Sequence, residues 1–219
     1  MTINRDRFTA AMTDASASVF RTSGDQRVAI SMCQLAAGQR ATIDAIACRS
    51  GSPEHDVEQR LAAWPAVRDD NGAVVGFRGL AAEAVTGHQI TFAGADTAWA
   101  WCAYDTLFIP DLLGTSARVT SRCPVTGTAV GLTVSPDGVD GLEPAEASIS
   151  LLAADAPIDD DVRQTLCQYI DFFASLAAAE QWVLGNPVTF WLPVADAFDV
   201  ARWTNAAVFP VLAADTERR

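Results

Sequence analysis

Two cysteines and one aspartate have the residue types and spacing that could bind a soft metal ion and move a proton beside it. Cys102 and Asp105 are three residues apart in the apolar segment 101–107, and Cys167 lies in a second helix-compatible segment. If residues 97–109 form a helix, positions i and i+3 share one face, so the thiol and the acid can meet the same bound atom. Soft metals prefer thiolate ligands, and a carboxyl group can carry a proton. These three residues are the candidate catalytic and metal-binding site.

The apolar residues of the first third recur at helical spacing. They predict three consecutive helices, which Gly38, Gly51 and Ser52-Pro53 would delimit. Asn71-Gly72 then lies between valines, which is a strong signal for a two-residue hairpin. Three helices and a hairpin are the element order of a winged helix, so residues 1–80 are predicted to form a winged-helix-like region. The predicted helices cover residues 28–37, 43–49 and a segment that follows Pro53.

From residue 88 onward, segments that alternate in polarity are separated by helix-compatible segments. The predicted strands are 88–92, 129–134 and 147–152. The predicted helices are 97–109, a short one starting at Ser135-Pro136, and the Cys167 helix, which the acidic residues 159–161 would open. The chain is therefore predicted to be an α+β protein. The N-terminal region, 1–80, is expected to pack on a second domain, 81–219, which contains the candidate catalytic residues and has a mixed or antiparallel sheet and flanking helices.

The composition narrows the classes of partner. Of 219 residues, half are apolar and 19% are charged, as in ordinary globular proteins. A formal net charge of −12 argues against nucleic acid as the main partner. Five widely spaced cysteines argue against a secreted disulfide framework, and the sequence has neither an apolar signal segment nor a membrane-length apolar run. We therefore expect a cytoplasmic protein with free thiols and no membrane contact.

Four segments carry a resemblance to a known family. Residues 101–107 read Trp-Cys-Ala-Tyr-Asp-Thr-Leu, and residues 162–175 place Cys167 ahead of Phe-Phe-Ala-Ser. Together with segments 112–119 and 131–136, they resemble organomercurial (alkylmercury) lyases, which break carbon–mercury bonds in bacterial mercury resistance and detoxification. The resemblance runs from about Phe20 to about Phe209 and is strongest between Trp99 and Ser175.

The resemblance and the chemistry of the reaction assign the same roles. Mercury prefers thiolate, and the departing carbon must receive a proton. Cys102 and Cys167 would bind mercury in turn, and Asp105, its pKa raised by apolar neighbours, would deliver the proton or relay it from a thiol. Small organomercurials would be the substrates. No bound cofactor is implied, but free thiols are needed for turnover, and a cytosolic thiol or a mercuric reductase would receive the Hg(II) product.

The chain departs from the family pattern at two positions near Cys167. The family often has a second cysteine where this chain has Gln168, and a histidine where it has Asp171. The loss of the second cysteine is expected to weaken metal relay more than bond cleavage. Cys123 matches a family cysteine position, and a structural role is favoured for it because no second cysteine lies nearby.

Other candidate residues have structural interpretations. Cys33 and Cys48 are expected to pack in the core of the N-terminal helices. His88 is expected on a strand near solvent. Trp99 and Trp101 are interpreted as core residues, although they could form an apolar wall for an organic group.

The sequence also allows two other functions. The first is a non-catalytic thiol protein that binds or carries mercury or copper on the same scaffold. The second is a metal-responsive winged-helix regulator. Glu54, Asp56 and Glu58 argue against the second, since they make the predicted recognition helix acidic. In the lyase family, a similar N-terminal region serves as a cover on the catalytic domain.

Overall fold

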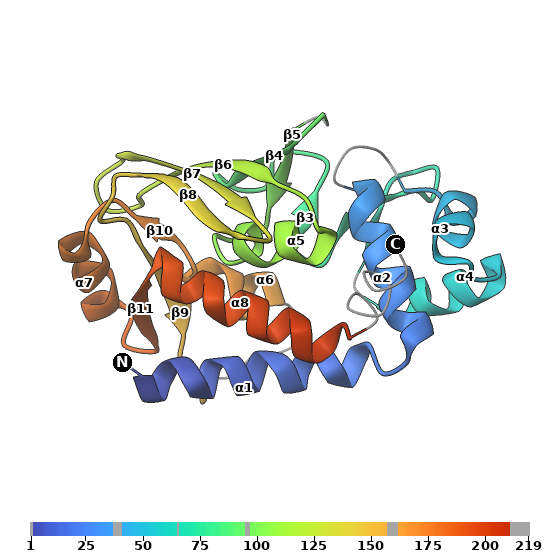
Figure 1. Cartoon of the computed structure of the whole chain (residues 1–219), viewed down its shortest axis with the longest axis horizontal. Coiled ribbons are helices and arrows are strands. Elements are labelled where there is room, and N and C mark those ends of the chain that lie inside the picture. The colour runs from blue at the N-terminus through green and yellow to red at the C-terminus, as the bar shows by residue number, and fades with distance from the viewer. Residues whose placement is uncertain (1, 37–40, 65, 95–96, 157–161, 211–219) are drawn as a thin grey trace.

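The protein consists of two antiparallel sheets packed against helices in this computed structural model, which describes all residues except 1, 37–40, 65, 95–96, 157–161 and 211–219 (Figure 1). The helices are α1 (Thr2–Val19), α2 (Ser23–Ala36), α3 (Ile43–Ser50), α4 (Glu54–Ala63), α5 (Asp105–Leu113), α6 (Val162–Thr165), α7 (Leu176–Gly185) and α8 (Val194–Val208), with a 3₁₀ helix η1 (Cys167–Tyr169). The strands are β1 (Ala66–Arg68), β2 (Val74–Phe77), β3 (Leu80–Ala81), β4 (Gln89–Phe92), β5 (Thr97–Ala100), β6 (Ala117–Arg122), β7 (Ala129–Ser135), β8 (Gly138–Glu143), β9 (Ser148–Leu152), β10 (Phe172–Phe173) and β11 (Thr189–Pro193).

Eight strands form the large sheet, in the order β1-β2-β3-β5-β4-β6-β7-β8, and three form the small one, β10-β9-β11. Every pair of neighbouring strands is antiparallel. The predicted α+β class with an antiparallel sheet is therefore confirmed. Strand β6 alternates strictly between buried and exposed residues, which is the pattern of a sheet with one face on the core.

Helices α5 and α8 cover the inner face of the large sheet, and α1 runs along α8 (Figure 1). The Asn205 amide links α8 to α5, because it donates to the Phe108 carbonyl and the Asp111 carboxylate of α5, both at 2.8 Å. The sequence pattern does not predict α1, since its apolar residues form no continuous stripe along one face. None of the helices described here is long and apolar enough to span a membrane.

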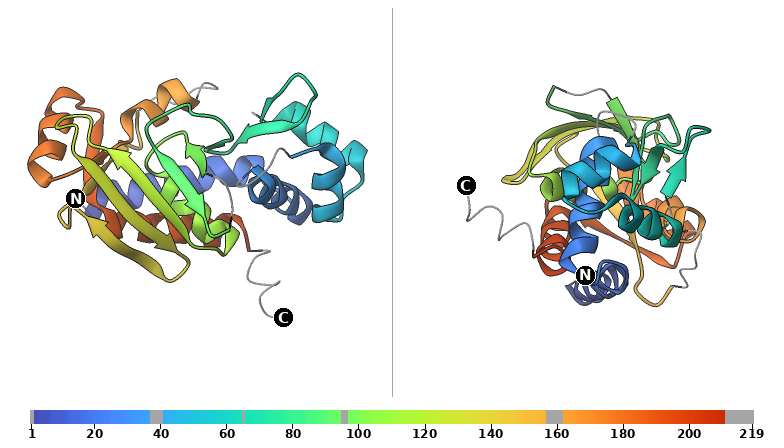
Figure 2. Two further views of the ribbon diagram at one scale, coloured as in Figure 1. Left: turned by 90° about the horizontal axis from the view of Figure 1, so that it is seen from above. Right: turned by 90° about the vertical axis from the view of Figure 1, so that its right-hand side faces the viewer.

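The N-terminal helices and hairpin occur in the predicted order. Helices α2, α3 and α4 precede the β1–β2 hairpin, and α3 and α4 lie beyond one end of the large sheet (Figure 2). The hairpin is not a separate wing, however. Strand β2 pairs onward with β3, and β3 pairs with β5, so the hairpin forms one end of the eight-stranded sheet.

Three predicted helices differ from the observed elements. Residues 97–100 form β5 because they pair with β3 and β4, and only Asp105 onward is helical. Ser135 pairs with Gly138, so the predicted short helix is instead a two-residue hairpin loop. The helix before Cys167 ends at Thr165, and the acidic residues 159–161 lie outside the described part of the chain.

Candidate functional site

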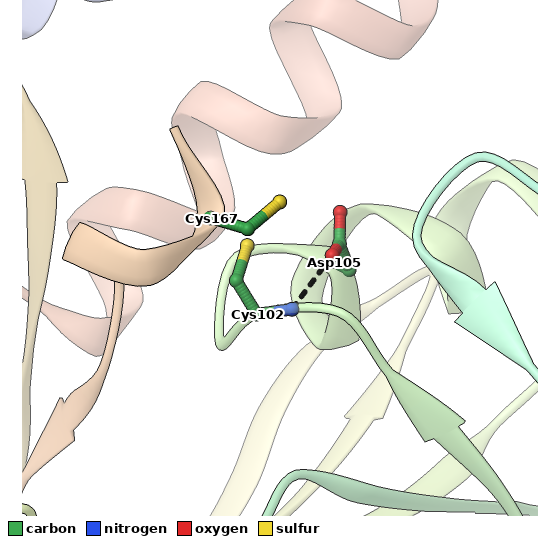
Figure 3. A group of neighbouring side chains, drawn as sticks. All are labelled: Cys102, Asp105 and Cys167. Carbon is green, nitrogen blue, oxygen red and sulfur yellow. Dashed lines mark hydrogen bonds between the residues drawn. The ribbon is translucent and has the colours of Figure 1, made fainter. Parts of the chain in front are cut away.

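Cys102 and Asp105 lie in the tight connection between β5 and α5. Strand β5 ends at Ala100, and Asp105 is the first residue of α5. The Cys102 backbone N–H donates a 2.8 Å hydrogen bond to Asp105 Oδ2 (Figure 3). A carboxylate is favoured at this helix end, where backbone N–H groups lack partners. The prediction of a shared helix face was therefore wrong, and a hydrogen-bonded turn brings the two residues together.

Cys167 lies in η1 and reaches the same place through main-chain contacts. The backbone N–H of Ala103, next to Cys102, donates to the Ile170 carbonyl at 3.2 Å. The Ser150 hydroxyl of β9 donates to the Tyr169 carbonyl at 2.7 Å. These two hydrogen bonds anchor the Cys167 segment between the small sheet and the Cys102 turn.

The three predicted site residues form one cluster. Two sulfurs and a carboxylate oxygen, one ligand atom from each residue, all lie within 4.8 Å of one another. Cys102, Asp105 and Cys167 are only 2%, 7% and 8% exposed, and their side chains face a common space (Figure 3). Within the described part of the chain, no other group of three such side chains is this close. The cluster provides two soft ligands and one proton carrier around a single point.

Burial alters the proton affinities of the cluster. It raises the pKa of Asp105 to about 6, although hydrogen bonds from Cys102 and the charges of His88 and Arg78 act in the opposite direction. Burial also raises the pKa of Cys102 well above its usual value, as do its hydrogen bond with Cys167 and the nearby Asp105 charge. Near neutral pH, the carboxyl is therefore mostly ionised and the Cys102 thiol keeps its proton. The thiol is thus the weaker acid, and its proton can pass to the carboxylate only as a soft metal binds the sulfur and stabilises the thiolate.

A cavity of about 270 Å³ opens onto the cluster. Asp105 and Cys167 line it directly, and most of its wall is apolar. Trp101 lies on the wall, as the alternative of an apolar wall for an organic group predicted. Four residues of α1 also contribute to the wall: Met12, Ala15, Ser16 and Val19. A buried cavity with an apolar wall and a few polar groups is the usual form of a small-molecule site.

Two residues beside the cluster were not predicted from the sequence. Gly79 has a φ of +90°, and a Cβ atom there would lie 2.4 Å from the Asp105 carboxyl. Only glycine allows this approach, and the Gly79 carbonyl also accepts the Trp101 N–H at 2.8 Å. Arg78, which precedes it, lines the cavity. In the sequence, only the glycine could have indicated these two positions, and a glycine can equally mark any turn.

The sequence model of the alkylmercury lyase family matches residues 82–205, more than half of the chain. The chain belongs to the alkylmercury lyase family. It is 38% identical to an alkylmercury lyase of Staphylococcus epidermidis over 173 residues, which is 78% of each protein. It is 40% identical to one of Streptomyces lividans, over 77% of this chain and 76% of that protein. The crystal structure of the mercury-bound form of MerB2 has the same fold, with a TM-score of 0.67 and 22% identity over 94% of this chain and 99% of that one.

The two residues at which the chain departs from the family pattern near Cys167 are not among the three clustered ligands. The Gln168 amide donates to the Gln164 carbonyl within its own segment. Asp171 Oδ1 lies 3.3 Å from His88 Nε2, and His88 Nδ1 lies 2.8 Å from the Ser121 hydroxyl. His88 is therefore buried, and its expected position near solvent was wrong. The second carboxylate faces His88 and is not one of the three clustered ligands.

The other three cysteines are not among the clustered ligands. Cys123 is buried in a small group with Phe173 and Ala178, consistent with the structural role favoured for it. Cys33 is fully buried, and burial raises the pKa of its thiol to about 12. Cys48 is exposed on α3, so its expected place in the core was wrong.

Proposed function

We propose that Cys102, Asp105 and Cys167 carry out the cleavage of carbon–mercury bonds, the activity of the family to which the chain belongs. The observation that supports these roles is the buried cluster of two sulfurs and one carboxylate oxygen, all within 4.8 Å. An organomercurial enters as R–Hg–X, where X is a displaceable ligand. The products are the hydrocarbon R–H and Hg(II) held by two sulfurs.

The first steps replace X by protein sulfur. As the Cys102 sulfur binds mercury and X is displaced, the Asp105 carboxylate accepts the thiol proton. The Cys167 thiol binds next, and its proton leaves with X as HX. Mercury then has two sulfur ligands and its bond to carbon, and the added electron density weakens that bond.

The final step returns the stored proton. The carbon–mercury bond breaks with its electron pair on carbon, and carbon takes the proton that Asp105 received from Cys102. The raised pKa of Asp105 supports this relay, because a carboxyl with a pKa of about 6 can both accept and release a proton near neutrality. Atoms and charges balance without an oxidant or a reductant.

We also propose that residues 1–80 serve as a cover over the site of the catalytic domain, residues 81–219. The cavity wall supports this role, since α1, Phe20, Trp64 and Phe77 all contribute to it. The acidic α4 gives no support for DNA binding.

The reaction needs no bound cofactor. A cytoplasmic thiol or a mercuric reductase would accept the Hg(II).

The test is headspace detection of benzene from phenylmercury, with excess 2-mercaptoethanol. Cys102→Ser, Asp105→Asn and Cys167→Ser should each reduce release at least about a hundredfold, because each removes a ligand or the proton carrier. Cys123→Ser is the matched control, since it alters a buried thiol outside the cluster, and it should retain turnover. Full turnover by any variant of the cluster would refute the role of that residue. Tight mercury binding without benzene from the wild type would instead favour a thiol carrier.

A further inference from the structure

Arg78 is a positively charged residue of the cavity wall that the proposed mechanism does not use. Its guanidinium carbon lies 4.7, 4.8 and 5.2 Å from the ring centres of Phe20, Phe209 and Phe108. Its Nε atom is buried and has no hydrogen-bond partner. Among the residues that the structure describes, the side chain forms neither a hydrogen bond nor an ion pair.

This arrangement is costly for the folded protein. Contact with aromatic rings offsets only part of the cost of burying Nε without a hydrogen-bond partner, while the side chain as a whole is half-buried. The φ of +47° at Arg78 belongs to the two-residue turn between Phe77 of β2 and Leu80 of β3, in which both turn residues have positive φ. A buried polar group without a partner tends to occur where a ligand binds.

The position of Arg78 connects it to the chemistry. The residue lines the same cavity as Asp105 and Cys167. Its neighbour Gly79 packs directly against the Asp105 carboxyl. The charges of Arg78 and Asp105 favour each other's ionised form, but the structure gives no salt bridge between the two side chains, and Asp105 Oδ2 accepts the Cys102 N–H. An anion in the cavity could therefore contact Arg78 while mercury is held at the cluster.

We infer that Arg78 binds a carboxylate that enters the cavity together with mercury. A guanidinium presents a planar set of donors that matches the two oxygens of a carboxylate. The small, mostly apolar cavity and the net charge of −12 disfavour larger, multiply charged anions. The carboxylate belongs either to the organic group of the substrate or to the thiol that accompanies mercury. The inference rests on the proposed function, and it names the substrate class that this site prefers.

The experiment compares matched pairs of compounds in two arms. In the first arm, 4-carboxyphenylmercury and phenylmercury are compared in 2-mercaptoethanol. In the second arm, phenylmercury is compared in mercaptoacetate and in 2-mercaptoethanol. Each arm yields a ratio of kcat/KM for the carboxylated over the neutral compound, measured for wild type, Arg78→Met and Arg78→Lys. Arg118→Met removes an exposed positive charge of β6 and is the matched control.

In one arm, Arg78→Met should lower the ratio by about ten- to a hundredfold, which is the usual effect of losing a charged hydrogen-bond pair. Arg78→Lys should keep part of the preference, because it retains the charge without the planar donors. Arg118→Met should leave the ratio unchanged. The arm that responds identifies the source of the carboxylate. Ratios that are the same in wild type and both Arg78 variants, in both arms, overturn the inference.

A binding measurement separates this inference from the proposed function. Asp105→Asn removes the proton carrier and should therefore bind the two aryl mercurials without cleaving them. Its equilibrium affinities for 4-carboxyphenylmercury and phenylmercury are then compared by competition with 2-mercaptoethanol. A preference for 4-carboxyphenylmercury in Asp105→Asn that disappears in Asp105→Asn/Arg78→Met supports the role of Arg78 even if no benzene is ever released. Equal affinities in both proteins reject that role even if the wild type is fully active.

Discussion

Replacement of Asp105 by asparagine should abolish activity and stabilise the fold. The carboxyl is buried, and burial raises its pKa from 3.8 to about 6. An ionised Asp105 is therefore less favourable in the folded protein than in the unfolded chain. Asparagine has nearly the same shape, is never ionised, and its carbonyl oxygen can still accept the Cys102 N–H.

The size of the effect follows from proton linkage. Well below pH 3.8, Asp105 is protonated in both the folded and the unfolded wild type, so ionisation costs nothing. Between pH 3.8 and about 6, the unfolded chain loses this proton before the folded protein does, and the free energy of unfolding of the wild type falls. The loss is about 3 kcal/mol above pH 7, and about half of that at pH 5. The asparagine variant avoids this cost, so its advantage should grow with pH.

The assay is denaturant unfolding of wild type and Asp105→Asn at pH 5 and pH 8, followed by the fluorescence of the six tryptophans. The difference in unfolding free energy between the two proteins should increase by about 1–2 kcal/mol from pH 5 to pH 8. The packing cost of asparagine cancels in this comparison, because it is the same at both pH values. Asp140→Asn, at an exposed position of β8, should show no such increase. A difference for Asp105→Asn that is the same at both pH values would falsify the raised pKa.

Three further outcomes test other parts of the site. First, kcat/KM should rise between pH 5 and pH 7 with an apparent pKa of about 6, because the ionised Asp105 accepts the thiol proton. A fall in kcat/KM over this range would mean that Asp105 is a simple acid that must start protonated. Second, Gly79→Ala should displace the Asp105 carboxyl, which its Cβ would approach to 2.4 Å, and should lower both benzene release and the free energy of unfolding, the latter by about 1–3 kcal/mol. Normal turnover of Gly79→Ala would contradict the proposed packing. Third, Cys123→Ala should lower the unfolding free energy by about 1–2 kcal/mol in denaturant titrations, because it leaves a small void beside Phe173. The variant should retain turnover. Loss of turnover in a folded Cys123→Ala protein would assign Cys123 to the reaction.

The sequence was enough to select three residues that the structure brings into one cluster, but not to show how they are held together. Residue types and spacing singled out Cys102, Asp105 and Cys167, because few side chains combine soft ligation with proton transfer. Their proximity depends on the hydrogen bond from Ala103 to Ile170. This contact joins residues far apart in the chain, and no local pattern encodes it.

Errors in predicting secondary structure have a similar physical origin. The segment 97–100 is a short run of small and aromatic residues, which suits a helix or a strand equally well. Pairing with β3 and β4 decides in favour of a strand. By contrast, β6 and β7 lie between the core and solvent, and the alternation along 129–134 was enough to predict β7 correctly.

The composition of the cavity wall bears on how members of this family could diverge. The three residues proposed to react all lie within residues 82–205, the part that matches the family model. Met12, Phe20, Trp64 and Arg78 line the same cavity from outside that part. Changes in the N-terminal third can therefore alter which organic groups fit without changing the three clustered residues. Two relatives with the same cluster would then detoxify different compounds, and their tolerance would be inherited through a part of the chain that the family model does not cover.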